Sequence, residues 1–343
     1  MTAESEWFLT SPIALPDGSY VRSYRNGARG PVYGEITAYA ISMACVWYHR
    51  TGDGRFLDRA RHSASYLRDV AQPGVRGPVD GRVYTFDTGI FASALLDLFA
   101  ASGDPSFLRE ATQRLDWLLA RASGVSLAAT VPEEDVADAQ RDAWPLRRAV
   151  HLAKMALPLL KGWRATEDER YRAAALRLFG WALSLQQPDG RFAIDEQHGA
   201  TMTHPHCYAA EALLYAAWAL QDDALRAALD RAAAWLAAAQ NADGSFDRWY
   251  GGGPRLLFRT KVSDATAQAL RIWRIMGKHP DNAARAESFL VSVALDDRGL
   301  PNYRRVLGPF EWRNNEVCSW ATFFWHHALS IDIGDGSAVA ELF

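Results

Sequence analysis

The chain has 343 residues, and its 37 basic and 40 acidic side chains leave a formal net charge of −3. Because the two signs are interspersed, without a basic stripe or a polybasic tail, the composition argues against a nucleic-acid or membrane-surface partner. The N-terminus lacks a basic start and an apolar core, and no apolar run approaches the ~20 residues of a membrane span, so we expect neither a signal peptide nor a transmembrane helix.

Helical periodicity dominates the chain and predicts helices in pairs. The first helix of each pair is apolar nearly all round, as in 38–47, which is typical of a buried helix. The second is rich in Ala and Arg and has a narrower apolar stripe, as expected of an outer helix with one solvent-exposed face. In chain order we predict the pairs 35–50 with 55–71, 87–102 with 105–121, 144–163 with 168–186, 205–220 with 223–240 and 263–277 with 281–294, and then a last helix at 316–331.

A turn that contains Asp and Gly recurs between the pairs at roughly 50–60 residues, the signature of a stacked or circular array of one unit. Two copies, 186–192 and 240–246, are close relatives. We therefore predict an all-α fold, an (α/α)6-type toroid that forms a single domain over 1–343. Its closing outer helix is missing or replaced by a terminal segment. Residues 1–30 read as an N-terminal extension, and 123–142, which lack the turn, as an irregular acidic loop or a lid over one rim.

The cysteines and histidines give no metal-binding pattern. Cys45, Cys207 and Cys318 lie far apart on predicted helices, so we expect buried reduced thiols and a cytoplasmic location. His204 and His206 share one loop, but no second pair has ligand spacing, so we expect no metal and no cofactor. The sequence carries no signal for an oligomeric state.

The toroid itself predicts where a site would lie. All inner helices of such a ring run in the same direction, so their N-termini and the loops before them surround one opening of the ring, which we call the mouth. Helix N-termini carry partial positive charge, so this opening favours anions. Polar and aromatic residues recur at these positions. The catalytic candidates are Asp87, Glu35, Asp264, His206 and His151. The substrate-binding candidates are Tyr33, Tyr84, Trp144, Arg147, His204, Tyr208, Trp249, Arg259, Lys261, Trp312, Glu316 and Trp320.

Each class of candidate has a catalytic and a structural interpretation. Paired carboxyls can act as acid and base where burial separates their pKa values, and their spacing distinguishes retaining from inverting sugar hydrolysis. Asp87 and Asp264 can equally be helix caps, and the histidines buried hydrogen-bonding groups. Arg259 and Lys261 can hold a substrate carboxylate or be ordinary surface charges. The Trp and Tyr residues can stack on sugar faces or pack in the core.

The two related turns resemble the QW-type motif of the squalene-cyclase and prenyltransferase toroids, in which such motifs tie an outer helix to the following turn. The Asp-x-Asp-Asp acid of class II terpene cyclases is absent from the sequence, as is a recognisable prenyltransferase zinc set. The resemblance therefore supports the toroid and argues against cyclase activity.

Other segments resemble bacterial α/α-toroid proteins of polysaccharide metabolism, including glucuronyl C5-epimerase C-terminal-like domains. Each begins an inner helix, and the segments are spread over most of the chain: 32–39, 84–90, 203–208, 261–268 and 318–320. Unsaturated-uronide hydrolases share the toroid, but their acid pair has no residue-by-residue match here.

This resemblance implies a carbohydrate-active enzyme. Its substrate would be a uronic-acid-like or polyhydroxylated saccharide, either a small molecule or an oligosaccharide. The reaction could be hydrolysis, elimination or C5 epimerisation. Two alternatives remain: a terpenoid cyclase-like enzyme, which predicts a dry aromatic cavity with a lone acid, and a non-catalytic saccharide-binding protein, which predicts a shallow mouth.

Overall fold

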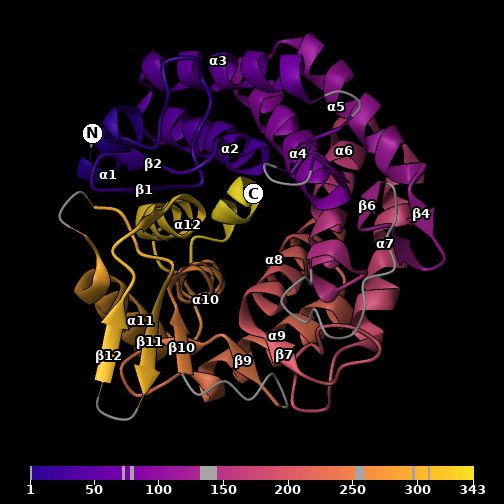
Figure 1. Ribbon diagram of the computed structural model, residues 1–343. Coiled ribbons are helices and arrows are strands. Elements are labelled where there is room, and N and C mark those ends of the chain that lie inside the picture. Colours follow the sequence, from indigo (N-terminus) through magenta and orange to yellow (C-terminus); the bar gives the residue numbers. More distant parts are fainter. Residues whose placement is uncertain are drawn as a thin grey trace.

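The chain folds into a ring of helices around a central axis (Figure 1). A computed structural model describes residues 2–71, 74–77, 81–131, 145–251, 259–295, 298–307 and 310–343. The inner helices are α2 (Gly34–Thr51), α4 (Thr85–Ser102), α6 (Ala156–Thr166), α8 (Thr203–Leu220), α10 (Ser263–Met276) and α12 (Ser319–Ser330). Each inner helix contacts the next, and α12 contacts α2, which closes the ring.

The outer helices cover the ring from outside. They are α3 (Gly54–Val70), α5 (Pro105–Leu119), α7 (Glu169–Ser184), α9 (Asp223–Ala239), α11 (Pro280–Val293) and the N-terminal α1 (Ala3–Thr10). The predicted (α/α)6 toroid is thereby confirmed, and the helices of all five predicted pairs are present.

Helix α1, from the other end of the chain, occupies the position of the closing outer helix. Its Trp7 ring lies 5.1 Å from the His326 ring, and Phe8 lies 5.7 Å from Phe323, so α1 packs on α12. The segment predicted as an N-terminal extension therefore contains the helix that fills the place beside α12.

The turns inside the helix pairs follow the chemistry that their sequence predicts. An Asp side chain accepts the backbone N–H two residues later and caps the outer helix, as expected for this residue type. The capping residues are Asp53, Asp104, Asp168 and Asp222. Gly52 and Gly103 end the preceding helices with φ of 69° and 70°, a conformation that glycine adopts without strain.

Two predicted helix starts are shifted. The helix expected from residue 144 begins as a 3-10 helix, η2 (Val150–Met155), and becomes regular only at Ala156. Pro158 has no N–H for the carbonyl of Lys154, so a regular helix cannot extend back through this point. The helix expected from 316 begins at Ser319, because Val317–Cys318 forms a strand.

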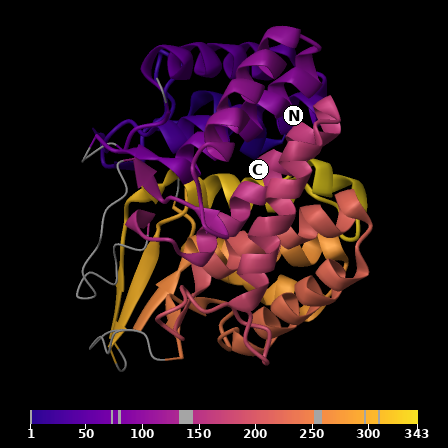
Figure 2. The ribbon, with the colours of Figure 1, turned by 90° about the vertical axis from the view of Figure 1, so that its right-hand side faces the viewer.

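Short antiparallel strands gather on one rim, at the left of Figure 2. The largest sheet has the order β12-β11-β10-β8, made of β8 (Phe246–Asp247), β10 (Arg259–Val262), β11 (Tyr303–Leu307) and β12 (Phe310–Arg313). A second sheet joins β1 (Ser23–Arg25), β2 (Ala28–Arg29) and β13 (Val317–Cys318). Two-residue pairs complete the rim: β3 (Val83–Tyr84) with β6 (Thr130–Val131), β4 (Ala122–Ser123) with β5 (Ser126–Leu127), and β7 (Thr201–Met202) with β9 (Trp249–Tyr250). Of the predicted acidic loop, 123–131 carry such strands and 132–142 lie outside the described residues.

The C-terminal residues enter the middle of the ring after the 3-10 helix η3 (Gly336–Glu341), as Figure 1 shows. The Phe343 ring lies 4.9 Å from that of His327 and 5.7 Å from that of Tyr39, and the Arg271 guanidinium lies 4.8 Å above it. This aromatic end fills the interior of the ring. In the described part of the chain, no helix is both long enough and apolar enough to cross a membrane.

Candidate active site

A cavity of about 350 Å³ opens at the rim where the inner helices begin. This volume lies at the lower end of the range of ~300–1,000 Å³ that is usual for small-molecule sites. Its lining combines carboxyl, imidazole, guanidinium and aromatic groups: Arg22, Tyr33, Glu35, Gly77, Tyr84, Phe86, Asp87, Pro145, His151, Met202, His204, Tyr208, Arg248, Asp264, Asn302 and Trp320.

One wall carries two carboxyl groups and a phenol. Tyr33 directly precedes α2, Glu35 lies in the first turn of α2 and Asp87 in the first turn of α4. Tyr33, Glu35 and Asp87 line the cavity together, and both carboxyl groups act on the Tyr33 hydroxyl electrostatically. Asp87 does not act as the N-cap, since Tyr84 holds that position and makes no side-chain capping bond.

Burial sets the protonation of Glu35. Loss of water raises its pKa to about 7, while hydrogen bonds from Tyr33 and Tyr39 and the charge of Arg22 oppose the rise. Near neutral pH this carboxyl therefore exists in both forms, which is the condition for a proton donor that must be reloaded. The pKa of Tyr33 is raised well above its usual value, first by burial and then by the two carboxylates.

The opposite wall carries His204, whose tautomer is assigned by its partner. Nδ1 of His204 lies 2.6 Å from Oε1 of Gln268, and the Gln268 amide donates to Glu211 at 3.2 Å. Because an amide oxygen only accepts, Nδ1 of His204 carries a hydrogen in this contact.

Asp264 lies beside this histidine at the start of α10. Its Oδ2 is 3.8 Å from Nδ1 of His204 and accepts from the Trp320 indole N–H at 3.4 Å. Its Oδ1 accepts from the Ala265 backbone N–H at 2.6 Å, so this carboxylate also holds the first turn of its own helix. The Trp320 ring is covered by the Arg22 guanidinium at 5.5 Å.

A buried ionic cluster supports this wall from below. Glu211 accepts from Lys154 at 2.6 Å and from both nitrogens on one side of the Arg271 guanidinium, and all three side chains are fully buried. Burial alone would raise the Glu211 pKa, but the charges of Arg271 and Lys154 lower it. Burial lowers the pKa of Lys154 to about 8, against the pull of Glu211.

The floor joins opposite sides of the ring. The hydroxyls of Tyr39 on α2 and Tyr208 on α8 lie 3.1 Å apart, and Phe86 packs on Tyr208 with ring centres 4.9 Å apart. His151 packs on Phe86 at 5.4 Å, and burial lowers its pKa to about 3, so its ring is neutral. Among the described residues, no three His, Cys, Asp or Glu side chains gather as a metal ion would require.

No protein-family model matches the sequence. Solved structures that resemble the fold include sugar epimerases, unsaturated glucuronyl hydrolases and a GH76 α-mannanase. A cellobiose 2-epimerase from Bacillus thermoamylovorans superimposes with a TM-score of 0.75 and 13% identity over 96% of this chain and 97% of that chain. An unsaturated glucuronyl hydrolase from Bacillus sp. GL1, described as responsible for glycosaminoglycan degradation, gives 0.66 and 15% over 91% and 90%. The fold is that of these α/α-toroid enzymes.

One curated protein shares sequence with part of the chain. A stretch of 99 residues, 29% of this chain, is 38% identical to an ent-copalyl diphosphate synthase from Streptomyces sp. (strain KO-3988) and covers 18% of that protein. The chain thus spans less than a fifth of the length of that relative.

Nine predicted site residues line the cavity together. They are Tyr33, Glu35, Tyr84, Asp87, His151, His204, Tyr208, Asp264 and Trp320. They come together because all the inner helices begin at the same rim.

His206 points the other way. It is two residues after His204, which on an α-helix is more than half a turn. Its Nδ1 accepts from the Phe192 backbone N–H at 3.2 Å, and its ring lies 4.5 Å from that of Trp235. Burial lowers its pKa to about 3. It is a hydrogen-bonded core residue outside the cavity.

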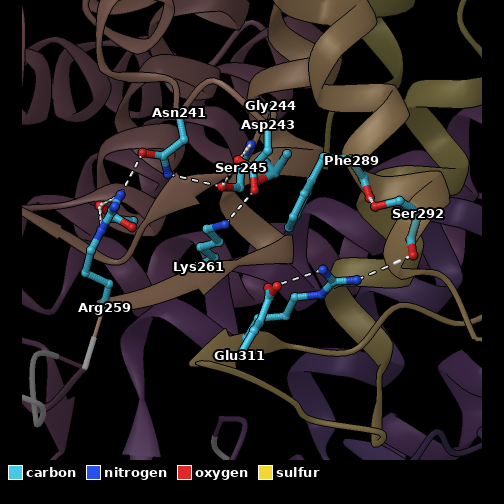
Figure 3. Close-up of polar contacts among 12 residues, drawn as sticks. Asn241, Asp243, Gly244, Ser245, Arg259, Lys261, Phe289, Ser292 and Glu311 are labelled. Carbon is cyan, nitrogen blue, oxygen red and sulfur yellow. Dashed lines mark hydrogen bonds and ion pairs between the residues drawn. The ribbon is translucent and has the colours of Figure 1, made fainter. Parts of the chain in front are cut away.

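The two cations expected to bind a carboxylate are paired with acids of the protein itself. Arg259 donates to Asp247 at 2.7 Å, and Lys261 donates to Asp243 at 2.6 Å, on the face of the sheet that Figure 3 shows. The cavity guanidiniums are instead those of Arg22 and Arg248. Their loops are placed by strand pairing and carry no sequence motif, which explains why helical periodicity missed them.

Four further candidates lie elsewhere, and one is not described. Trp249 packs on a small cluster of Ala149, Ile194 and Met202, and Arg147 is half-buried outside the cavity. Trp312 is exposed on β12, and Glu316 accepts a hydrogen bond from Ser23. Trp144 lies outside the described residues.

Proposed function

We propose that the protein is a carbohydrate-active enzyme, a hydrolase, lyase or epimerase, that performs acid–base chemistry on a uronic-acid-like or polyhydroxylated saccharide. The observation that carries this proposal is the grouping of Glu35, Asp87 and Tyr33 in one cavity where the Glu35 pKa is about 7. The sugar-directed activities of the structural neighbours support the substrate class.

The two walls have complementary roles in this proposal. Glu35 and Asp87 belong to α2 and α4, and His204 and Asp264 to α8 and α10, which stand across the ring from them. Glu35 donates a proton on one side of a bound sugar. Nε2 of His204 accepts one on the other side. A donor and an acceptor on opposite sides of the sugar suit inverting hydrolysis, elimination and epimerisation.

The remaining lining residues would position the substrate. The Trp320 ring offers an apolar surface for a sugar face, and the Arg22 and Arg248 guanidiniums can bind a carboxylate with two parallel hydrogen bonds. The buried free thiols Cys45, Cys207 and Cys318 support a reducing, cytoplasmic location as part of the same proposal.

The test is turnover of a saccharide panel that includes unsaturated uronides, uronic acids and neutral disaccharides, followed by chromatography of the products. Glu35→Gln and Asp87→Asn keep the shape of each side chain and remove its proton chemistry. We expect both to abolish turnover of whichever saccharide the wild type converts. Asp247→Asn, on the same rim but outside the cavity, is the control. Binding without turnover would make the protein a saccharide-binding protein.

The partial match to the synthase favours a second candidate, a terpenoid cyclase-like enzyme. Phe86, Tyr208 and Trp320 give the cavity an aromatic lining that suits an isoprenoid chain. The same cavity also holds three carboxyl and two imidazole groups, which suits a polar substrate better. Conversion of an isoprenoid diphosphate by the wild type, with no saccharide converted, would select this candidate.

A further inference from the structure

A second hollow lies on the rim, outside the cavity. It measures about 420 Å³ and is lined by Arg25, Tyr303, Arg305, Trp312, Arg313 and Asn314. We call Arg25, Tyr303, Arg305 and Trp312 the rim strip. Three of its four residues come from the β11–β12 hairpin and one from β1.

The hairpin has two chemically different faces. In antiparallel pairing, residues opposite each other point to the same face, and successive residues alternate. Arg304 is opposite both Arg313 and Lys261, whereas Arg305 is opposite Trp312. Arg304 and Arg313 both donate to the Ser292 carbonyl of α11, so their face is turned toward the ring. Arg305 and Trp312 belong to the other face.

On the face toward the ring, three cations are paired with acids of the protein. Arg304 pairs with Glu311 at 3.2 Å, Lys261 with Asp243, and Arg259 with Asp247 (Figure 3). On the outer face, Arg25 and Arg305 are exposed and form no ion pair with any part of the chain that the structure describes. The rim strip therefore presents uncompensated positive charge.

Large aromatic groups accompany this charge at the surface. The Trp312 side chain is 49% exposed, and Tyr303 lies under the Arg305 guanidinium at 5.2 Å. An exposed large aromatic beside an arginine marks a contact surface more often than chance, since both residue types are enriched at binding sites. Guanidiniums match carboxylate and sulfate groups, while an indole offers a flat apolar face.

The rim strip continues from the cavity. Arg22 lines the cavity and Arg25 the hollow, so an extended chain separates them by about 10 Å. Asn302 of the cavity is followed directly by Tyr303 of the strip. Strand β1 also pairs with β13, with Tyr24 opposite Val317, and this pairing keeps the two strands side by side.

We propose that the rim strip is a binding subsite for an anionic saccharide chain whose terminal unit occupies the cavity, with Arg25 and Arg305 binding carboxylate or sulfate groups and Trp312 stacking on a sugar face. The inference rests on the proposed function and deepens it, because it makes the substrate an acidic oligosaccharide longer than the cavity holds.

Calorimetric titration of the full chain with a hexagalacturonate and a heparin hexasaccharide tests it without requiring turnover. We expect binding of at least one hexasaccharide that weakens with added salt. In Arg25→Ala/Arg305→Ala the affinity should fall about tenfold, and in Trp312→Ala by a similar factor. Arg259→Ala, on the opposite face of the same sheet, is the matched control and should stay within about twofold of the wild type.

Maltohexaose and a six-nucleotide oligothymidylate complete the series. Equal affinity of wild type and double variant for the anionic hexasaccharides, or no binding of either, overturns the proposal. Tighter binding of the oligonucleotide than of both saccharides would replace the saccharide ligand with a nucleic acid. Strip-dependent binding without any saccharide turnover would leave this inference standing and remove the proposed function. Turnover that Glu35→Gln abolishes, together with binding that does not depend on the rim strip, would support the proposed function and overturn this inference.

Discussion

Glu35 differs from an exposed carboxyl group in its pKa. Burial at the cavity wall removes water from it, and the donors Tyr33 and Tyr39 restore part of the lost stabilisation of the charged form. The result is a pKa of about 7, where the group can both hold and release a proton. Such an environment costs stability whenever the proton is absent, so function and stability are opposed at this position.

Glu35→Gln should therefore lower the activity and, at the same time, remove a pH-dependent loss of stability. In the proposed function the acid form of Glu35 donates the proton, so wild-type activity should fall as pH rises through about 7, and the variant should lose ~10²–10⁴-fold in kcat. A pKa raised from 4.5 in the folded state contributes stability that is full below pH 4.5 and lost by about pH 7.

Glu35→Gln should not show this pH-dependent loss of stability. Between pH 5 and pH 8, the change in its unfolding free energy should be ~1–3 kcal/mol smaller than the change in the wild type. Urea unfolding at the two pH values and a pH–rate profile measure both effects. An unchanged pH dependence of stability in the variant would contradict the assignment.

His204 depends on a neighbour that does not line the cavity. Gln268 accepts from Nδ1 of His204 and donates to Glu211, so its amide transmits the position of a buried carboxylate to the imidazole. In the proposed function Gln268 is a positioning residue, because its amide oxygen keeps a hydrogen on Nδ1 of the imidazole.

Gln268→Leu should remove this selection. We expect kcat to fall roughly tenfold or more with little change in KM, because the base is then present partly in the wrong tautomer. Nitrogen NMR of the imidazole provides a readout that a merely structural role would not change. The wild type should show hydrogen on Nδ1 of His204, and the variant a mixture. Hydrogen on Nε2 in the wild type would refute the assignment.

At the scale of elements, the cluster of Glu211, Lys154 and Arg271 ties α8 to η2 and α10 beneath the cavity. Lys154 also donates to a main-chain oxygen of Phe343 at 2.7 Å, which joins the chain end to the same group. Removal of one member leaves buried charge without its partner, and this is costly even where the intact pair contributes little net stability.

Arg271→Met should lower the unfolding free energy by ~3–5 kcal/mol, since it deprives the Glu211 carboxylate of its guanidinium. Lys278→Ala breaks an ion pair with Asp230 at 2.7 Å whose side chains are 50% and 39% exposed, and it should cost less than ~1 kcal/mol. Chemical unfolding of the two variants side by side gives the comparison. Similar losses in both would mean that the buried cluster has no special part in joining the helices.

The elements also show what a sequence of this kind predicts. Helix pairs, Asp caps and the mouth follow from local periodicity and from the common direction of the inner helices, and that logic placed Glu35, Asp87, Asp264 and His204 together. It could not separate His204 from His206, because both satisfy the pattern and only the helix phase assigns one of them to the core. It missed Arg22 and Arg248, whose positions depend on two-residue strand pairs between distant segments.

At the scale of the whole molecule, the ring is closed by segments from both ends of the chain. The N-terminal α1 occupies the outer position next to α12, and Phe343 fills the interior between Tyr39 and His327. An open array would let each helix pair unfold with its neighbours alone, whereas a closed ring makes the last pair depend on the first.

Phe8→Ala tests this closure. Phe8 is 1% exposed and packs on Phe323, Tyr20 and Phe56 with ring centres 5.7, 5.8 and 6.2 Å away, so it joins α1 to α12, α3 and the loop before β1. Removing its ring should cost ~3–5 kcal/mol from lost burial and the cavity that remains. Leu176→Ala, at a position 38% exposed on α7, should cost far less. Because closure couples all the pairs, calorimetry should show a single transition that moves to lower temperature in Phe8→Ala. If the variant instead shows an early transition confined to the helices nearest the ends, followed by an unshifted one, the pairs unfold as in an open array and the ring does not act as one unit.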